Sequence, residues 1–365
     1  MKIGILTHYN VINQGAILQM YAMQKWLEQH GHNVYILTYN KNFDFMPHEE
    51  SKYNISIKYL SFYIREYLLK KGLFITLFNI KKRLMHKKYL YKTFSLKNYT
   101  VDLMDVVIVG SDEVFSITTG CNTMMFGHGV NSKRLVSYAP SFGQTDICRI
   151  NQYNCKELII SGLQKFSHLS ARDEKSIEII NELTGVKPQL VCDPVLLYDF
   201  TQEIVKAKIP IKKYLLIYSY DAHLSTSEEF SGIKKYAKSK GLITVSAGTY
   251  HKWCDKNLVC NPMVWLEYFR NAEQVFTDTY HGAILSIITN KPSVYFIRNL
   301  NKNKLTFLLH SLGLESRIAK CLTFDELNTI YSQSMDFSKV NIKWSKTRKQ
   351  SEDYLYECIN GKNIS

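Results

Sequence analysis

The chain has 365 residues, of which 45% are hydrophobic and 13% aromatic, so it encodes a folded protein and not a disordered one. This length exceeds what one ordinary core accommodates, and two domains are expected. The net charge of +14 favours an anionic partner, whereas eight cysteines without a CxxC pair or metal-ligand spacing argue for reduced cytosolic thiols and against a metal site.

The chain begins with the pattern of a parallel sheet. Residues 3–7 are apolar and strand-like, residues 14–29 have helical spacing, and residues 34–38 form a second apolar strand. Strand, helix and strand in this order make a βαβ unit. No signal-peptide pattern precedes the first strand and no apolar run is long enough to cross a bilayer, so we expect a cytoplasmic protein.

The turn before the first helix reads Asn13-Gln14-Gly15. It shares a glycine with dinucleotide-binding loops, but the GxGxxG pattern is absent. Taken alone, it predicts an ordinary turn into a helix.

Most of the positive charge lies in residues 52–97, which hold twelve Lys and Arg and one acid, Glu66, with aromatic and aliphatic residues between them. This mixture predicts amphipathic helices with a basic face. Such a face suits an anionic membrane surface or a diphosphate, and a solvated helical face is the alternative. We expect no nucleic acid as a partner, because no nucleic-acid-binding motif is present and the basic stretch is confined to one segment.

A second polar turn follows the buried strand at residues 105–109. It contains Ser111 and Asp112 at the carboxyl end of that strand. Asp112 could act as a base or bind sugar hydroxyls; alternatively, either residue caps the next helix. A further strand at 135–138 leads into a turn with Ser141.

An arginine ends the next strand. Residues 168–172 read as a short strand between helices at 155–167 and 175–183. Arg172 at its end suits bidentate binding of an anion. The alternative is a salt bridge with a neighbouring acid, Asp173 or Glu174.

The charged residues 206–213 predict a linker, and a second βα series follows it. Its expected strands lie at 214–218, 244–247, 275–277 and 294–297, and its expected helices at 228–240, 263–271, 283–288, 304–312, 324–333 and 345–360.

Within this series, the turn 278–282 lies between a buried strand and a helix. Ligands of parallel sheets bind beyond the carboxyl ends of the strands, where this turn lies. His281 and Gly282 are then at a helix N-terminus, which favours an anion, and a histidine there can exchange a proton near neutral pH. The alternative is that Asp278 or Thr279 is a plain N-cap and His281 a solvated residue.

Several of these turns occur together with motifs that suggest a family. They are Asn13-Gln14-Gly15-Ala16-Ile17-Leu18-Gln19, Gly110-Ser111-Asp112-Glu113-Val114-Phe115, Ser137-Tyr138-Ala139-Pro140-Ser141-Phe142-Gly143, Ser170-Ala171-Arg172-Asp173, Asp193-Pro194-Val195-Leu196-Leu197 and Thr277-Asp278-Thr279-Tyr280-His281-Gly282. The series resembles the polysaccharide pyruvyl transferase family from residue 3 to about residue 333. The combination is specific to the family, although no single motif is.

The resemblance implies an α/β fold with two Rossmann-like domains that face each other across a cleft, similar to GT-B glycosyltransferases. We expect an N-terminal domain at 1–205 on the acceptor side, with a basic helical insertion at about 45–100. A C-terminal domain at 206–335 would lie on the donor side, and 336–365 would form a helical tail.

The resemblance also implies an activity. The family transfers pyruvate from phosphoenolpyruvate to two hydroxyls of a sugar, which gives a cyclic ketal and phosphate, without a cofactor. Its acceptors are cell-surface polysaccharide precursors, often linked to a lipid diphosphate. A peripheral contact with the inner face of the membrane would fit such an acceptor.

Many family members carry an arginine, thought to hold the donor, two residues before the motif histidine. Here that position is Thr279, so the donor's charge must be met elsewhere, and Arg172, Arg298 and Lys304 are the candidates. As catalytic residues we expect His281, as the proton donor to C3 of phosphoenolpyruvate, and Asp112, as base or acceptor-positioning group. The expected substrate-binding residues are Arg172, Arg298, Gly282, Thr279, Tyr280, Lys304, Asn13, Gln14, Gly15, Ser111 and Ser141.

Two other functions fit parts of the sequence. A GT-B glycosyltransferase would use the same helix start for the diphosphate of a nucleotide sugar. A non-catalytic membrane-surface assembly protein would be built around residues 52–97. These alternatives depend on fold analogy or on charge alone.

Overall fold

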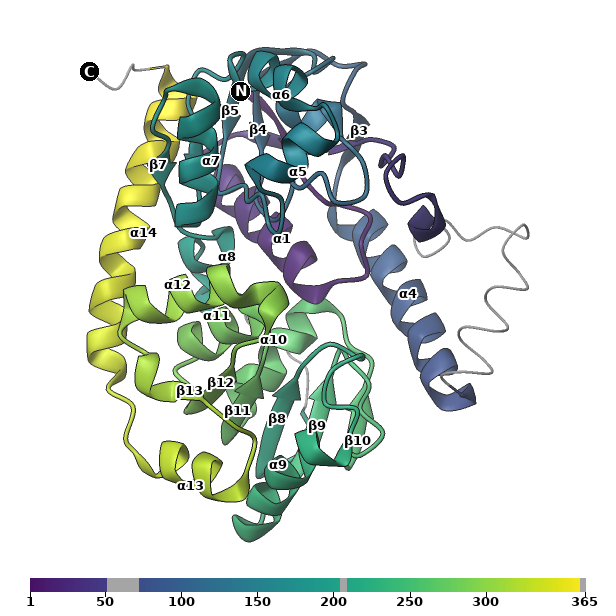
Figure 1. The fold of residues 1–365 in the computed structure, drawn as a ribbon, viewed down its shortest axis with the longest axis vertical. Coiled ribbons are helices and arrows are strands. Elements are labelled where there is room, and N and C mark those ends of the chain that lie inside the picture. Colours follow the sequence, from purple (N-terminus) through teal and green to yellow (C-terminus); the bar gives the residue numbers. More distant parts are fainter. Residues whose placement is uncertain (51–71, 204–208, 362–365) are drawn as a thin grey trace. The chain divides into compact units, whose positions relative to one another are not determined.

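The computed structural model describes residues 1–50, 72–203 and 209–361, and these form two compact units (Figure 1). Among the described residues, the first unit comprises 1–50, 90–198 and 346–361, and the second comprises 72–89, 199–203 and 209–345. The assignment of acceptor and donor sides to the domains stays a prediction.

The first unit is built on five parallel strands in the order β3-β2-β1-β4-β5. Their bounds are β1 Lys2–Leu6, β2 Asn33–Thr38, β3 Leu96–Asn98, β4 Met104–Val109 and β5 Ser132–Ser137, and a separate parallel pair is formed by β6 Ser170–Ala171 and β7 Gln189–Leu190. The central strands read as continuous apolar runs because helices cover both faces of the sheet.

Helices pack on either face of this first sheet. Their bounds are α1 Gln14–Gln29, α5 Ile147–Gln152, α6 Lys156–Leu163, α7 Glu174–Thr184 and α8 Pro194–Leu197. One core joins α5, α6 and α7 to strand residues such as Val107 and Leu135. Alternate strand residues such as Ile5 and Ile108 are also fully buried and face the opposite side, where α1 packs with α8. From Lys346 onward, α14 (Phe337–Asn360) belongs to this unit, and the Tyr354 hydroxyl donates to the Ser137 carbonyl.

The second unit has six parallel strands in the order β10-β9-β8-β11-β12-β13. Their bounds are β8 Tyr214–Tyr218, β9 Ile243–Ala247, β10 Lys256–Leu258, β11 Gln274–Thr277, β12 Ser293–Phe296 and β13 Ile318–Ala319. The short strands β10 and β13 at its edges, like β3 in the first unit, were not predicted.

Helices cover both faces of the second sheet as well. Their bounds are α9 Ser227–Ser239, α10 Pro262–Asn271, α11 Tyr280–Ile288, α12 Lys302–Leu312 and α13 Phe324–Ser332. Residues of α9 and α13 share one core with β8, β11 and β12, and Figure 1 shows α9 alongside β8 and β9. On the other face, Trp265 of α10 packs against Tyr218 with ring centroids 4.5 Å apart.

Short 3-10 turns connect some of these elements. They are Pro47–Glu49, Thr123–Phe126, Phe200–Gln202, Asn299–Asn301 and Glu315–Arg317. The α/β prediction with two Rossmann-like domains is confirmed, because each unit is a parallel sheet between helices. In both units the carboxyl ends of all strands meet at one edge of the sheet, which is where ligands of such folds bind.

The described part of the basic insertion is α4 (Leu73–Thr93), whereas residues 51–71 lie outside the described residues. Phe78, Lys82 and His86, four residues apart, are buried. The opposite face exposes apolar side chains, from 45% to 77% of their surface, at Leu73, Phe74, Leu77, Ile80, Leu84 and Tyr91. The helix thus buries two ionisable side chains and exposes apolar ones, unlike an ordinary amphipathic helix. No helix in the described ranges is both long and apolar enough to cross a membrane.

The buried face of α4 carries two ionisable side chains. Phe78 packs edge-on against Tyr250 within the second unit, with ring centroids 5.4 Å apart. Burial lowers the pKa of Lys82, and the charge of Asp221 opposes that shift. Burial, together with the Lys82 charge, lowers the pKa of His86 to about 3. Both ring nitrogens of His86 are buried without a hydrogen-bond partner among the described residues. His86 is therefore neutral in the folded protein.

We predict that His86 makes folding sensitive to acid. Its pKa is lower in the folded chain than the unfolded value of 6.5, so the unfolded state binds a proton first and stability falls as the pH drops from 6.5 toward 3. Relative to His86→Met, the wild type should lose about 1.4 kcal/mol between pH 8 and pH 5.5. Urea midpoints measure this difference. The exposed His310 on α12 provides the control, because His310→Met should follow the wild-type trend; a pH-independent difference at His86 would contradict the prediction.

Candidate active site

The loop after β4 in the first unit has a tightly constrained backbone. Gly110 has φ of +124°, and a Cβ there would lie 2.1 Å from the Tyr138 carbonyl oxygen, so only glycine fits. Asp112 has φ of +78°, a conformation that non-glycine residues rarely adopt. Its carbonyl accepts a bond of 2.8 Å from the Ser141 amide. The loop thus fixes Asp112 at the carboxyl edge of the sheet, with 17% of its side chain exposed.

Arg172, just after β6, is buried between two carboxylates. Its Nη1 donates to Asp193 Oδ2 at 2.8 Å and its Nη2 to Asp112 Oδ1 at 3.1 Å. The side chains of Arg172 and Asp193 are 1% and 0% exposed. The acids that pair with Arg172 are therefore Asp112 and Asp193 rather than the neighbouring acids, and Asp173 instead caps α7 through the Ser176 amide. This arrangement makes Arg172 a group that holds Asp112 in place.

Two further residues near Asp112 were not predicted from the sequence. His8 follows β1 and Lys41 follows β2, so both lie at the same edge. The Nε2 of His8 is 3.3 Å from the Glu113 carbonyl, which only accepts, so Nε2 carries the proton and Nδ1 accepts from Tyr39 Oη at 2.9 Å. Burial lowers the pKa of His8 and of Lys41, and the charge of Asp112 opposes both shifts. In the sequence, the only sign of these two residues was that each closely follows an expected strand.

The other predicted residues of the first unit take part in its loop structure. Asn13 caps α1 by accepting from the Gly15 amide at 2.9 Å, and Gln14 and Gly15 are buried in the first turn. Ser111 is fully buried and donates to the Ala139 carbonyl, whereas Ser141 accepts from the Gly143 amide. These contacts explain the residues structurally, and their binding to a substrate stays a prediction.

The start of α11 in the second unit is closed by two threonines. Thr279 is the N-cap and accepts from the Gly282 amide at 3.1 Å, and Thr277 Oγ1 lies 3.0 Å from Thr279 Oγ1. A Cβ on Gly282 would lie 2.1 Å from Thr277 Oγ1 and 2.6 Å from Thr279 Oγ1. Glycine at 282 is therefore required by this packing, and Thr279, 1% exposed, is a buried cap.

His281 lies in the first turn of α11, beside an aromatic ring. Its side chain meets Tyr280 edge-on, with ring centroids 5.5 Å apart, and the residue is 8% exposed. Lys304 of α12 places its Nζ 5.9 Å from the Tyr280 ring centroid. The structure thus brings three of the predicted residues together, and His281 is buried rather than solvated.

Asp278, immediately before the cap, is the centre of a charged network. Its Oδ2 accepts from His223 Nδ1 at 2.8 Å and from Arg298 Nε, and it is fully buried. Arg298 Nη1 donates to Glu229 Oε1 at 2.8 Å. Burial tends to raise the pKa of Glu229, but the bonds from Arg298 and the Ser225 amide outweigh it and lower that pKa. The charge of Arg298, predicted to bind the donor, is thus already shared between Asp278 and Glu229.

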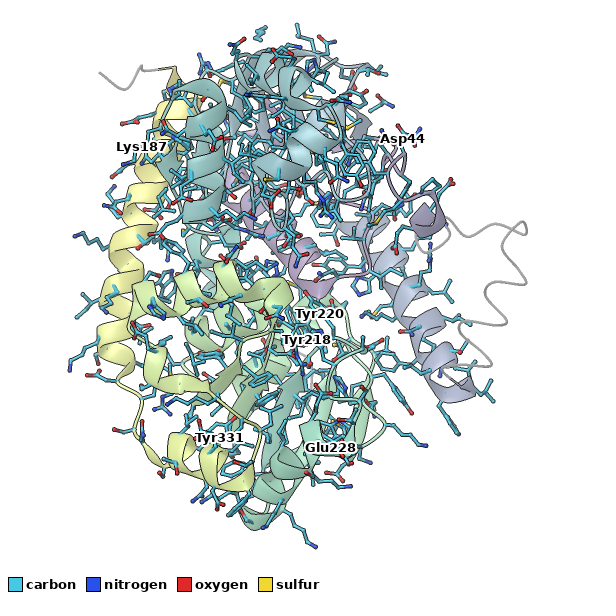
Figure 2. All side chains as sticks on the ribbon, viewed as in Figure 1. Asp44, Lys187, Tyr218, Tyr220, Glu228 and Tyr331 are labelled. Carbon is cyan, nitrogen blue, oxygen red and sulfur yellow. The ribbon has the colours of Figure 1, made fainter. Side chains whose placement is uncertain are left out.

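Two histidines on neighbouring loops were also missed by the sequence reasoning. His223 follows β8, where Figure 2 labels Tyr218 at the strand end and Tyr220 in the loop that follows. His251 follows β9, and its Nε2 lies 3.0 Å from the Ser219 carbonyl. Burial lowers the pKa of His251. Within the described residues, no group of three or more His, Cys, Asp or Glu is arranged to hold a metal ion.

A sequence model described as polysaccharide pyruvyl transferase matches residues 13–299, which is more than half of the chain. The chain belongs to the polysaccharide pyruvyl transferase family. Comparison with curated protein sequences gave no match.

Solved structures show the fold of this pyruvyl transferase. The UDP-N-acetylglucosamine 2-epimerase from Rickettsia bellii is similar with a TM-score of 0.51 and 10% identity, over 100% of this chain and 98% of that one. S. aureus MnaA, solved with UDP, is similar with a TM-score of 0.50 and 12% identity, over 98% of this chain and 97% of that one. Arabidopsis thaliana UGT89C1, complexed with UDP-L-rhamnose, is similar with a TM-score of 0.50 and 9% identity, over 99% of this chain and 97% of that one. The predicted GT-B-like fold is confirmed by these similarities, which at such identities concern the fold alone.

We predict that Arg172→Met destabilises the protein by about 3–5 kcal/mol, because removal of the guanidinium breaks the ion pair of the buried Asp193. Adding Asp193→Asn should recover part of the loss, since asparagine keeps the α8 cap and carries no charge. Urea midpoints followed by circular dichroism measure both changes. The control Lys156→Met, on the exposed side of α6, should be neutral; additive losses in the double variant would contradict the prediction.

Proposed function

We propose that this pyruvyl transferase moves pyruvate from phosphoenolpyruvate to two hydroxyls of a sugar, forming a cyclic ketal and releasing phosphate. The observation that carries the proposal is the family membership together with a buried histidine, His281, in the first turn of a helix at the edge of a parallel sheet. An imidazole beside a helix N-terminus is near any anion bound there and can transfer a proton near neutral pH.

Phosphoenolpyruvate is a compact anion, and its site needs cations and oriented N–H groups. The start of α11 supplies backbone amides and the positive end of the helix dipole. Lys304, next to Tyr280, supplies an ammonium group, and Arg298 adds a guanidinium fixed by two carboxylates. Arg172 is assigned to the positioning of Asp112 instead, because its charge is shared by Asp112 and Asp193.

The reaction begins with a proton transfer to carbon. C2 of the enol phosphate is not electrophilic until C3 is protonated, and His281 as imidazolium donates that proton. The first sugar hydroxyl then adds to C2, phosphate leaves, and the second hydroxyl closes the ketal. Asp112 orients the acceptor or removes a hydroxyl proton in the first unit, where the Lys41 ammonium favours anionic parts of a lipid-diphosphate-linked acceptor.

The outer face of α4 supports a contact with an anionic membrane surface at the cytoplasmic side. Its exposed leucines and aromatic residues are accompanied by lysines at positions such as Lys81 and Lys88, which are also exposed. Apolar side chains that enter the headgroup region, with cations next to them, are the features of an interfacial helix. A lipid-linked acceptor would bring its enzyme to such a surface.

We predict that His281→Ala lowers phosphate release from phosphoenolpyruvate by at least about 100-fold, because no proton donor remains for C3. Phosphate is measured with a panel of lipid-linked saccharides as acceptors, and NMR detects the ketal methyl group of the product. Circular dichroism of the variant should still show a folded protein, so that the loss of turnover is not a loss of the fold. Near-normal turnover in the variant would reject the role.

Thermal shift of the wild type separates this proposal from a nucleotide-sugar glycosyltransferase. Phosphoenolpyruvate should raise the melting temperature, whereas UDP and GDP should not, because a ligand stabilises only the state that binds it. Stabilisation by a nucleoside diphosphate alone would favour the glycosyltransferase. Vesicle binding without any consumption of donor would instead favour the assembly protein.

We predict that serine at Leu77, Ile80 and Leu84 together weakens binding to vesicles of phosphatidylserine and phosphatidylcholine by at least about tenfold, because three apolar side chains no longer enter the interface. Vesicle co-sedimentation gives the partition constant. Serine at Val101 and Ile342, which are 70% exposed on other elements, is the matched control and should bind as the wild type does. Equal loss in both variants would reject α4 as the contact.

A further inference from the structure

The loop after β8 places a histidine against a buried carboxylate. β8 and β11 are adjacent parallel strands, so the residues after their carboxyl ends meet at one edge. There His223 Nδ1 lies 2.8 Å from Asp278 Oδ2. A carboxylate only accepts hydrogen bonds, so Nδ1 carries the proton and Nε2 of the neutral ring has the basic lone pair. The His223 side chain remains 14% exposed.

The carboxylate that orients His223 is itself rigidly held. Asp278 is fully buried, and Asn301 Nδ2 donates to its carbonyl oxygen. Its Oδ2 accepts from both His223 and Arg298, so the imidazole and the guanidinium lie side by side. Oδ1 of Asp278 is buried without a hydrogen-bond partner in the described residues. A fixed carboxylate of this kind sets the tautomer of an imidazole and stabilises the imidazolium that forms when it takes a proton.

The guanidinium of Arg298 lies beside this pair. Arg298 is neutralised in part by Glu229 on α9, and its Nη2 is buried without a protein partner in the described ranges. An oxygen of a bound anion at Nη2 would therefore lie next to the His223 ring. Ionisable groups near this pair in the described part of the chain include Tyr220, whose ring meets the His223 ring edge-on with centroids 5.7 Å apart. They also include Asp221, in the same loop, and His251, whose Nε2 is directed to the Ser219 carbonyl.

We infer that His223, oriented by Asp278, is a second proton-transfer residue of the ketal-forming reaction, in addition to His281. This role depends on the proposed function. It assigns to the second unit a base for the acceptor hydroxyl.

The proton balance of the reaction requires such a group. His281 gives one proton to C3 as the C3–H bond forms, and the first hydroxyl oxygen bonds to C2. The neutral Nε2 of His223 takes the proton of that hydroxyl and returns it to the phosphate oxygen as the C2–O bond to phosphate breaks. The second hydroxyl then bonds to C2, and its proton restores the imidazolium of His281. Two protons leave the sugar, one reaches C3 and one reaches phosphate, so the enzyme ends as it began.

The test compares His223→Asn with the wild type. The asparagine Nδ2 can still donate to Asp278 but cannot carry a proton between substrates. We expect kcat for phosphate release to fall about 100-fold or more, while the Kd for phosphoenolpyruvate, measured by calorimetry, changes less than about threefold. The matched control His310→Asn, exposed on α12, should leave both values unchanged. Exogenous imidazole should restore part of the kcat of His223→Gly, which a merely structural role would not allow.

Each outcome decides one of the two proposals. Wild-type kcat in His223→Asn, or no imidazole rescue in a folded His223→Gly, overturns the inference and leaves the proposed function intact. A parallel loss of kcat and of donor binding also overturns it, since His223 would then act on binding. Failure of the wild type to release phosphate from phosphoenolpyruvate with any acceptor overturns the proposed function, and the inference with it.

Discussion

Each unit depends on one arginine shared between two carboxylates at the carboxyl edge of a parallel sheet. Arg172 joins Asp112 to Asp193, and Arg298 joins Asp278 to Glu229. A parallel sheet collects the ends of all its strands at one edge, so acidic residues placed there for chemistry are crowded and partly desolvated. Burying such carboxylates is unfavourable unless a cation is hydrogen-bonded to them, and the planar guanidinium donates to two at once. The arginines thereby hold Asp112 and Asp278 in one orientation.

Hydrogen-bond acceptors also determine which ring nitrogen of each nearby histidine carries the proton. His8 and His251 direct Nε2 to backbone carbonyls, whereas His223 directs Nδ1 to Asp278. A ring nitrogen next to an obligate acceptor must carry the proton, so the opposite nitrogen is the basic one. In His223 that is Nε2, and in His251 it is Nδ1. The two rings lie on adjacent loops after β8 and β9, yet they present different atoms to their surroundings.

The sequence predicted the parts that depend on local pattern. The βαβ periodicity located the central strands but not the short edge strands, and the turn before residue 283 located the start of α11 with Thr279 among the possible caps. The pairing of charges was not predictable, because Arg172 lies 60 residues from Asp112 and His223 lies 55 residues from Asp278 along the chain. Nor did composition indicate that α4 buries Lys82 and exposes its leucines, since only the packed neighbours decide which face is covered.

Thr279 shows why the cation for the donor must come from another element in this chain. The residue is 1% exposed, and its hydroxyl caps α11. That hydroxyl lies so close to the α-carbon of Gly282 that there is no room even for a Cβ at position 282. An arginine at this position would remove the cap and would need space that the threonine pair occupies. Lys304 instead extends from α12 to the face of Tyr280, and Arg298 comes from the end of β12. On the proposed function, a small capping residue before the histidine therefore requires cations from the segment that follows β12, and both features serve to hold a small anionic donor.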